Sequence, residues 1–484
     1  MRSYKPIREG SPARLRLAGA IICWSALTGI GAATPVRIKW VPHPGEVLEY
    51  CDAYRNVTEA EPMWTWFQRR VKTESLKDGL ALVSVHTDDG VPQFKPTFLK
   101  TLDSEQSEMF DPYGEFTITP SEDEQSRTIA YPKRPVNVGD TWARTVHEQE
   151  GTCHTTYTLT GLQKIDGLET FAVAVHCKET RKKLVLHSDG LVWLDRQDGS
   201  LVAMKRRYQS PDAGKVETWD EALGRLGFGE TQPSMLRWLP RSGPSHRFVV
   251  NTWAKTSTGG RRSGSNLGDD YVTEVTASTV EISTAERVLR LTTDGVDQAV
   301  PSQSEEIDLV RDRHGAFISY KTKPEAPGEG GTLACELLVF PAYALNRGQS
   351  WGHDYSADPS QGLAPTTMTF HYRGSVSVGG FRAFCISYDF KEYGIPHPAQ
   401  GGGMFLIDRS DGSQLALTRN WDYWSPHMDC EVSAQDRVSV ALEPVAAAGE
   451  RFGHRTRDAR PHRPHRYLRL RSSRPHRILH QHLE

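Results

Sequence analysis

Three pairs of closely similar motifs recur along this chain in the same order. The pairs are KWVPHPG (39–45) with RWLPRSG (237–243), YPKRPVNVGDTW (131–142) with FPAYALNRGQSW (340–351), and LDRQDGS (194–200) with IDRSDGS (407–413). Their offsets of 198, 209 and 213 residues drift slowly, as an old duplication with small loop insertions would produce. The sequence therefore predicts two tandem copies of one unit, at residues 38–228 and 236–446.

Both copies have the residue pattern of β-strands. TYTLTGLQKIDGLETFAVAV (156–175) alternates apolar and polar residues around a glycine-containing turn, and its counterpart MTFHYRGSVSVGGFRAFCISYDF (368–390) does the same. Such alternation is typical of half-buried antiparallel hairpins. No stretch predicts an amphipathic helix of more than three turns, apart from a weak pattern at Trp219 to Leu226. The chain is therefore predicted to be all-β.

The first of these hairpins carries two signals for its register, and they disagree. The dipeptide Asp166-Gly167 suggests a two-residue type I′ turn, which pairs residues whose numbers sum to 333. An even sum instead collects five apolar residues on one face: Tyr157, Leu159, Phe171, Val173 and Val175. Because a buried face sets strand register, we predict an even sum, here 330. Gly161 and its equivalent Gly374 lie inside strands and predict a shared bend or bulge.

This register places Cys153 directly opposite Cys177. Facing cysteines on neighbouring strands come within disulfide reach, and an exported protein meets an oxidising compartment. We therefore predict a Cys153–Cys177 bridge, with two separate thiols as the alternative. The second copy has Thr366 and Phe390 at these positions, so the bridge would belong to one copy alone. Three pairings stay open for the other candidates, which are Cys51, Cys335, Cys385 and Cys430.

Histidines beside these cysteines suggest a metal site, which strand geometry opposes. The same register sets His154 opposite His176, but adjacent residues of a strand point to opposite sides of the sheet, so four ligands cannot converge on one zinc ion. A two-histidine site completed by His147 or His187 is the alternative. The chain also lacks the zincin, serine-hydrolase, phosphate-loop and dinucleotide-binding signatures. We predict no metal, no cofactor and no catalytic motif.

The repeated motif LDRQDGS and IDRSDGS predicts a tight turn that is used twice. Asp195 and Asp408 precede Arg-x-Asp-Gly, which suits a type I turn in which Gly199 or Gly412 takes the left-handed conformation. Paired carboxylates could serve acid–base chemistry, but a catalytic loop need not be kept twice beside matching strands. The motif also lacks the alternating oxygen ligands of a calcium loop. We interpret both turns as structural.

Two aromatic pairs are the candidates for ligand contact. Trp64 and Trp66 share one face of a predicted strand, and so do Trp421 and Tyr423. Such rings stack on sugars or line a lipid groove, and they also fill the cores of half-buried strands. Ligand binding and core packing are therefore both open for these four residues.

The two ends of the chain differ from its body. Residues 1–33 combine five basic residues, the apolar stretch LAGAIICWSALTGI and small residues before Thr34, which predicts a secretory signal peptide; an uncleaved membrane anchor is the alternative. Residues 447–484 form an Arg/His-rich stretch with no period, either a disordered tail or an out-of-frame translation. Residues 34–449 have a net charge of −13, which argues against nucleic acid as a partner of the folded body.

The motif YPKRPVNVGDTW, the glycine-punctuated hairpin and the closing LDRQDGS together resemble exported bacterial domains of unknown function. Some of these domains are similar in outline to lipoprotein-carrier half-barrels of the LolA/LppX type. The resemblance covers the latter half of each copy and implies a strongly curved antiparallel sheet that shields an apolar ligand. Cys23 follows Ile22 and is no lipid anchor, unlike the anchor of many relatives. No functional residue carries over.

These observations predict an exported, periplasmic or extracellular module that binds or carries an apolar or glycan ligand in the cell envelope. Two alternatives remain open: an envelope hydrolase whose site is assembled from several strands, and a structural module without a ligand. The binding module predicts an apolar groove, the hydrolase predicts a pocket where His, Asp or Glu side chains meet, and the structural module predicts neither. The cavities of the folded chain and the residues that line them distinguish the three.

Overall fold

The computed structural model describes most of the body of the chain. The described residues are 34–57, 64–88, 94–100, 103–114, 116–118, 129–147, 151–181, 184–212, 215–300, 305–322, 337–360, 363–426 and 428–440. All regular secondary structure in these ranges is β-strand, and they hold no helix long and apolar enough to cross a membrane. The prediction of an all-β chain is confirmed. The predicted signal peptide, the C-terminal tail and Cys335 lie outside the described residues.

The first copy forms one antiparallel sheet of 11 strands, in the order β5-β4-β3-β2-β1-β11-β10-β9-β8-β7-β6. Its strands are β1 (Val47–Asn56), β2 (Trp64–Lys77), β3 (Leu80–Asp88), β4 (Asp103–Phe110), β5 (Phe116–Ile118), β6 (Thr141–His147), β7 (Gly151–Ile165), β8 (Leu168–Arg181), β9 (Leu184–Asp195), β10 (Leu201–Asp212) and β11 (Lys215–Arg225). Because β1 pairs with β11, one arm of the sheet runs from β1 to β5 and the other from β11 to β6.

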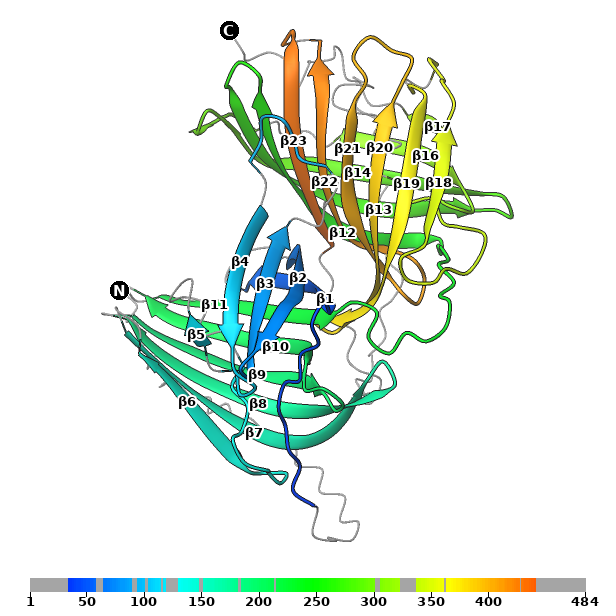
Figure 1. The fold of residues 1–484 in the computed structure, drawn as a ribbon. Helices are drawn as coiled ribbons and strands as arrows, with labels where there is room; N and C mark the ends of the chain where they lie inside the picture. The colour runs from blue at the N-terminus through cyan, green and yellow to red at the C-terminus, as the bar shows by residue number, and fades with distance from the viewer. Residues whose placement is uncertain are drawn as a thin grey trace, which may run out of the picture.

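The second copy repeats this layout in a sheet of 12 strands, in the order β17-β16-β14-β13-β12-β23-β22-β21-β20-β19-β18, with β15 paired to β14. Its strands are β12 (Gly243–Thr256), β13 (Arg261–Val275), β14 (Thr279–Thr293), β15 (Val296–Asp297), β16 (Glu305–Asp312), β17 (Phe317–Thr322), β18 (Ser350–Tyr355), β19 (Thr366–Val378), β20 (Phe381–Glu392), β21 (Gln400–Asp408), β22 (Gln414–Ser425) and β23 (Cys430–Val440). In each sheet the two arms cross, so that the sheet curls over an inner face (Figure 1).

A glycine bulge reconciles the two register signals of the β7–β8 hairpin. Asp166 and Gly167 both have positive φ, 46° and 89°, as a type I′ turn requires, and the pairs next to the turn sum to 333. A bulge at Gly161 (φ 141°) then shifts the register, so that the pairs beyond it sum to 332. The β19–β20 hairpin has the same shift at Gly374 (φ 126°). The sum beyond the bulge is even, as predicted, but the predicted value of 330 places each partner two residues away from the observed one, because the turn fixes the sum at 333 before the bulge lowers it by one.

The inner face of each sheet is closed at one end by two chain segments. In the first copy, Val36 pairs with Val136 across these segments, and in the second copy Ser234 pairs with Leu345. A tryptophan anchors the later segment in each case, since the indole Nε1 atoms of Trp142 and of Trp351 each donate to a backbone carbonyl at 2.7 Å. The two apolar cores inside the sheets form around these segments.

The repeated turns close the same ends by contacting the repeated tryptophan motif. Gly199 and Gly412 have φ values of 73° and 75°. A Cβ atom on Gly199 would lie 2.1 Å from the carbonyl oxygen of Lys39, and one on Gly412 would lie 2.0 Å from that of Arg237. These glycines therefore allow a backbone contact that any side chain would block. In both copies the Asp of the turn accepts hydrogen bonds from turn amides, at 2.9 Å for Asp195 and 2.7 Å for Asp408.

The outer faces of the two sheets pack against each other. One apolar cluster joins side chains of β1, β2 and β11 to side chains of β19, β20, β21 and β22. Trp64 and Trp66 lie in it, 6.4 and 6.1 Å from the ring of Phe381. A Cβ atom on Gly224 would lie 2.4 Å from the carbonyl oxygen of Ser377, so this glycine lets the sheets approach closely. The packing hides the strand pattern of β11, which is buried on both faces, and the weak helical pattern there is wrong.

Charged groups surround this apolar contact. Glu49 of β1 binds Arg373 and, at 2.8 Å, Arg347, which both belong to the second copy. Burial by itself raises the pKa of Glu49, but the positive charges of Arg373 and Arg347 outweigh it and hold that pKa below its ordinary value. Asp166 of the first hairpin binds Arg409 at 2.9 Å in the same way. Ion pairs between the copies therefore border the apolar cluster.

We predict that the two bulge glycines differ in their tolerance of a side chain. Both have positive φ, so Gly161→Ala lowers the free energy of unfolding by about 1–2 kcal/mol through backbone strain. Gly374→Ala costs about 3 kcal/mol, because its Cβ would also lie 2.9 Å from the backbone nitrogen of Gly227 in the first copy, whereas Gly161 has open space. Chemical denaturation of both variants measures the difference. Equal losses would contradict the close contact of the copies.

We predict that Glu49 stabilises the contact at neutral pH and not in acid. A carboxyl whose folded pKa is lowered contributes stability above its ordinary range, and the contribution is lost as the pH falls through the folded pKa. Glu49→Gln should therefore lower the free energy of unfolding by about 2 kcal/mol at pH 7 and have little effect near pH 3. The exposed Glu74→Gln is the control and should change nothing measurable. A loss independent of pH would refute the role of the charge.

Candidate functional site

Each sheet holds a buried arginine opposite an acidic residue on its inner face. Arg206 of β10 faces Glu221 of β11, and Arg419 of β22 faces Asp436 of β23. The residue exposures are 2% for Arg206 and 5% for Arg419. Arg419 Nη2 donates to Asp436 Oδ2 at 2.6 Å. A buried charge is tolerated only with a partner, and both sheets carry an arginine and a carboxylate at the same register position.

Neighbouring residues make room for these arginines and keep them charged. A Cβ atom on Gly190 would lie 2.7 Å from Arg206 Cγ, so this glycine leaves the space that the side chain crosses. Burial opposes the charge of Arg206, but its hydrogen bond to Tyr208 and the charge of Glu221 keep its pKa above the ordinary value. Arg419 lies 3.8 Å above the ring of Trp421, which provides a cation–π contact in the second copy.

Large side chains cover the inner face of the first sheet beside this pair. Tyr54 faces Glu221 in the register and donates to its Oε1 at 3.1 Å. On β2, Phe67 contacts Tyr54 edge to face at 5.7 Å, and Arg69 binds Asp52 at 2.5 Å. These side chains bond and pack among themselves on the inner face.

The equivalent positions of the second sheet carry smaller or apolar residues, and a cavity opens there. The register matches Asp52, Tyr54, Phe67 and Arg69 of the first copy to Val250, Thr252, Asn266 and Gly268 of the second. The cavity has a volume of about 520 Å³ and is bounded by β12, β13, β14, β16, β22 and β23. This volume lies in the range of small-molecule sites. The two copies thus share one frame, and three of these four inner positions carry smaller side chains in the second copy.

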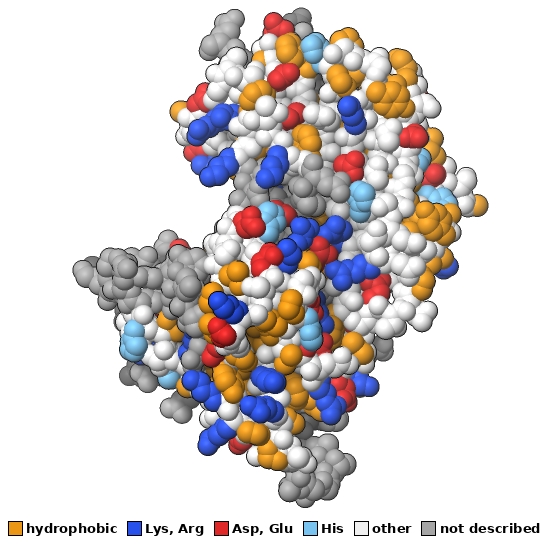
Figure 2. Space-filling model, in the orientation of Figure 1, with side chains coloured by type: hydrophobic (Ala, Val, Ile, Leu, Met, Phe, Trp, Pro, Cys, Tyr) orange, Lys and Arg blue, Asp and Glu red, His pale blue; other side chains and the backbone are white. Residues whose placement is uncertain are grey.

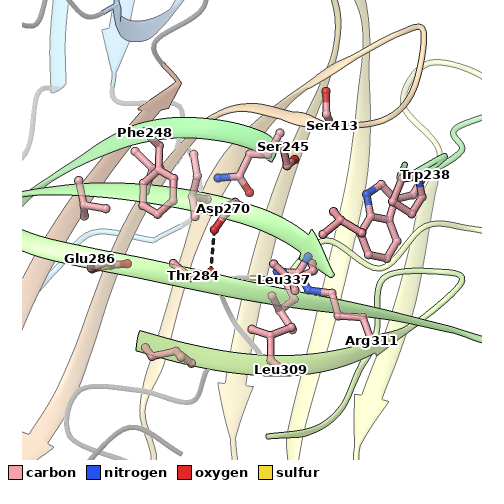
Figure 3. Close-up of a pocket in the computed structure, with 18 of the residues that line it drawn as sticks. Trp238, Ser245, Phe248, Asp270, Thr284, Glu286, Leu309, Arg311, Leu337 and Ser413 are labelled. Carbon is pink, nitrogen blue, oxygen red and sulfur yellow. Dashed lines mark hydrogen bonds between the residues drawn. The ribbon is translucent and has the colours of Figure 1, made fainter. Parts of the chain in front are cut away.

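The cavity has an apolar wall with charged groups at defined points. Leu309 and Leu337 project into it near Arg311 and Trp238, while Glu286 lies at the opposite side, as Figure 3 shows. Asp270 accepts a hydrogen bond from Thr284 at 2.6 Å. The other apolar residues that line it are Leu239, Pro240, Phe248, Val250, Val272, Ile282, Ile307, Leu417 and Val438. The arrangement suits an amphipathic molecule.

A second hollow, of about 880 Å³, lies where the two copies meet. Its charged residues are bonded to one another, for example Arg225 to Asp195 at 3.0 Å and Arg347 to Glu49 at 2.8 Å. On the face shown in Figure 2, basic and acidic side chains are interspersed around this junction. These ion pairs join structural elements. Among the described residues, few charged groups of the hollow are therefore available to a ligand.

The aromatic residues considered for ligand contact lie in packed regions. Trp64 and Trp66 are 3% and 4% exposed and lie between the two sheets, which corresponds to the alternative of core packing. Trp421 is 5% exposed, stacks on Tyr423 at 6.3 Å and supports Arg419. None of the four lines the cavity of the second sheet, so their contribution to it is indirect at most.

Cys153 and Cys177 are close but not directly opposite. With sums of 332, Cys153 faces Glu179 and Thr155 faces Cys177, so the two cysteines are diagonal neighbours on one face. Their Sγ atoms are 3.1 Å apart and carry thiols, and the hydrogen bond between them lowers the pKa of Cys177. The predicted direct opposition is wrong, because the register beyond the bulge places the partner of Cys153 two residues farther along β8. The bridge itself stays a prediction.

The remaining cysteines and the histidines form no site in the described part of the chain. Cys51 and Cys385 both lie in the cluster between the sheets, and burial raises the pKa of Cys385 to about 12. His154 and His176 are not opposite each other and bond separately, to Thr145 at 2.9 Å and to Asp189 at 2.5 Å. The described residues contain no cluster of His, Cys, Asp and Glu able to hold a metal ion.

Comparisons with known proteins show no family for this chain. Neither a protein-family description nor a curated protein matches it. Among solved structures, Pseudomonas aeruginosa OpdL (7% identity, 81% of this chain and 97% of that chain), a BenF-like porin from Pseudomonas fluorescens Pf-5 (8%, 84% and 98%) and Pseudomonas aeruginosa OccK2 (OpdF) in complex with glucuronate (7%, 82% and 97%) are similar at TM-scores of 0.11. Such low scores carry no argument about fold or function, and these matches give the lipoprotein-carrier resemblance no support.

Sequence reasoning missed the buried arginine–carboxylate pairs and the open positions beside one of them. The sequence does contain a signal for the two arginines. Arg206 and Arg419 are 213 residues apart, the same offset as the two turn motifs, and each lies in a segment with the alternating pattern of a strand. Thr252, Asn266 and Gly268 carry no comparable signal. Their small size is informative only by comparison with the bulky residues at the equivalent positions of β1 and β2, and only the strand register identifies those positions.

We predict that Cys153 and Cys177 form a disulfide when the chain folds under oxidising conditions. A shift of about 1 Å brings the two Sγ atoms to the length of a disulfide bond, near 2.05 Å. Peptide mapping without reductant should then recover the two cysteines in one linked peptide, and reduction should lower the free energy of unfolding by about 3 kcal/mol. Alkylation of both thiols in the oxidised protein would show that the bridge does not form. Cys153→Ala is the control.

Proposed function

We propose that this chain is an exported, non-catalytic binding protein whose ligand site is the cavity inside the second sheet. The cavity itself carries the proposal: about 520 Å³ of space beside a buried arginine–carboxylate pair. Its counterpart in the first sheet carries bulkier side chains, so the space is a property of one copy and not of the fold. A structural module that binds no ligand is not expected to differ between its two copies in this way.

The lining favours a small amphipathic ligand. Trp238, Leu309 and Leu337 offer apolar contact, while Arg311, Asp270 and other polar groups could orient a ligand's head groups. Burial of apolar surface supplies most of the binding free energy in such sites, and a few placed polar groups supply specificity. Both ligand classes expected from the sequence, apolar molecules and glycans, have parts that this lining could contact.

The chemistry of the lining favours binding over hydrolysis. The described lining contains no histidine, cysteine or lysine, the side chains that most often transfer protons or act as nucleophiles near neutral pH. Asp436 is engaged by Arg419 and Asp270 by Thr284. These contacts hold carboxylates in place as hydrogen-bond acceptors, which is the role of an orienting group.

The proposed location rests on the sequence. The basic and apolar segment before Thr34 supports export to the periplasm or the exterior, and the net charge of −13 for residues 34–449 disfavours nucleic acid. A carrier role, in which a ligand is handed from one protein to another in the envelope, is the finer form of the proposal. Its support is the amphipathic lining of the cavity.

We predict that filling the cavity with the first copy's own residues abolishes binding. The variant Thr252→Tyr with Asn266→Phe places the equivalents of Tyr54 and Phe67 in the second sheet. The wild-type chain should bind the neutral fluorescent probe N-phenyl-1-naphthylamine at one equivalent, and the filled variant should bind it at least ten-fold more weakly because the apolar space is occupied. Fluorescence titration measures both.

The control for this experiment is a change on the outer face of the same region. Arg287 is exposed next to Glu286 on β14, so Arg287→Gln should leave probe binding unchanged. The melting temperature shows whether each variant is folded. A folded, filled variant that still binds one equivalent with wild-type affinity would rule out this cavity as the site.

A further inference from the structure

The inner face of the first sheet holds two thiols in contact with each other. Cys153 of β7 and Cys177 of β8 are 1% and 6% exposed, and their Sγ atoms are 3.1 Å apart. Thr155 faces Cys177 in the register, and its hydroxyl oxygen lies 3.6 Å from Cys153 Sγ. Ser188 faces Cys177 from β9, and its hydroxyl has no hydrogen-bond partner among the described residues. The two sulfur atoms therefore lie among hydroxyl groups.

The side chain of Arg206 brings a positive charge toward these thiols. It starts on β10 and crosses β9 at Gly190, where a Cβ atom would lie 2.7 Å from Arg206 Cγ. Gly190 in turn faces Val175 of β8, two residues from Cys177. Arg206 is buried, and its Nε and Nη2 atoms have no hydrogen-bond partner among the described residues. A buried cation with unsatisfied donors stabilises an anion that forms near it.

The second copy keeps the arginine but not this arrangement. Its Arg419 donates to Asp436 at 2.6 Å. In the first copy the oxygens of the equivalent carboxylate, Glu221, accept from two tyrosine hydroxyls instead, from Tyr54 at 3.1 Å and from Tyr208. The second copy also has no cysteine at either thiol position. The two thiols and an arginine directed toward them are therefore features of the first copy alone.

These neighbours favour the thiolate form of Cys177. Hydrogen bonds from Cys153 and Thr155 and the positive charge of Arg206 lower the pKa of Cys177, and together they outweigh burial and the carboxylate of Glu179, which raise it. The hydrogen bond between the two sulfur atoms raises the pKa of Cys153, so Cys153 keeps its proton. The thiolate is the nucleophilic form of cysteine. The pair thus combines a nucleophile with a second thiol in contact with it.

We propose that this pair is a redox site at which Cys177 reduces a small hydroperoxide. The thiolate sulfur attacks one peroxide oxygen, the O–O bond breaks, and the leaving oxygen takes a proton from solvent. Cys177 is thereby oxidised to a sulfenic acid. Cys153 Sγ then attacks the sulfur of Cys177, the S–O bond breaks, and the proton of Cys153 leaves with the hydroxide as water. One peroxide gains two electrons, and two thiols become one disulfide.

The burial of the pair selects the oxidant. Exposures of 1% and 6% admit a molecule as small as hydrogen peroxide, whereas exchange with a peptide disulfide depends on open access to the attacking sulfur. Each chain reduces one peroxide, and the disulfide persists until a thiol reductant regenerates the pair. The site lies in the first sheet, so it is independent of the ligand cavity proposed for the second sheet.

Reaction of the reduced full chain with hydrogen peroxide at pH 7 tests this site. We expect Cys153 and Cys177 to form one disulfide per peroxide, at least ten-fold faster than free cysteine reacts, because free cysteine is only a few per cent thiolate at this pH. Burial raises the pKa of Cys385 to about 12, so this residue is the internal control and should stay reduced. Oxidised glutathione should react more slowly with the chain than with free cysteine. Alkylation followed by peptide mass spectrometry measures each thiol.

Variants assign the roles within the site. Cys153→Ser should accumulate a dimedone-reactive sulfenic acid on Cys177, whereas Cys177→Ser should accumulate none on Cys153. Arg206→Gln should slow the oxidation of Cys177 about ten-fold, and Arg206→Lys, which keeps the charge, should restore most of the rate. Lys205→Gln removes an exposed cation from the other face of the same strand and is the matched control. The melting temperature shows whether each variant is folded.

Three results would overturn the proposal. The first is oxidation of the wild-type pair no faster than that of free cysteine, which needs no variant to fold. The second is equal sulfenic acid labelling of the two single-cysteine variants, which would show that Cys177 is not the distinct nucleophile. The third is an unchanged rate in folded Arg206→Gln, which would remove the guanidinium from the site. Rapid oxidation by glutathione disulfide would contradict the assignment of a small hydroperoxide as the oxidant.

Discussion

A strongly curved sheet must have its inner face covered, and the rest of this structure follows from how each copy meets that constraint. Chain segments around Val136 and Leu345 close one end of each inner face, and the repeated turns hold the preceding strand-entry segments against them. Farther in, each copy places a buried arginine opposite a carboxylate. The first copy covers the remaining surface with Tyr54, Phe67 and Arg69, and the second leaves a cavity there. A few side chains at equivalent positions therefore distinguish the inner face of the second copy from that of the first.

The outer faces meet the same constraint by covering each other. Trp64, Trp66 and Phe381 form the centre of that contact, and Glu49 with its arginine partners borders it. Glycines at the contact allow an approach that a Cβ atom would prevent, as at Gly224 and Gly374. The outer face of each sheet therefore covers the outer face of the other. This arrangement also explains why two of the aromatic candidates for ligand contact are buried.

The sequence predicts the frame of this molecule better than its site. Alternation at Tyr157 to Val175 and the repeated motifs are local signals, and they suffice for an all-β chain in two sheets with glycine bulges. The predicted partner of Cys153 is wrong by two residues, because a bulge at Gly161 satisfies the turn and the buried face together, and a single integer sum cannot describe both. The sequence of β11 weakly predicts a helix, because packing on both faces removes the alternation of apolar and polar residues that is typical of a strand. The cavity is lined by Thr252 and Asn266, which are smaller than their equivalents about 200 positions earlier, and no local pattern records such a comparison.

The central claim is that both copies enclose the same inner space and that four side chains decide whether it is open. The most direct measurement is the binding stoichiometry of N-phenyl-1-naphthylamine in a chain whose first copy carries the second copy's residues: Asp52→Val, Tyr54→Thr, Phe67→Asn and Arg69→Gly. These changes remove both members of the Asp52–Arg69 ion pair. The account predicts a second equivalent of bound probe in the folded variant. A folded variant that still binds one equivalent would show that the two inner spaces are not equivalent, and the account would be wrong.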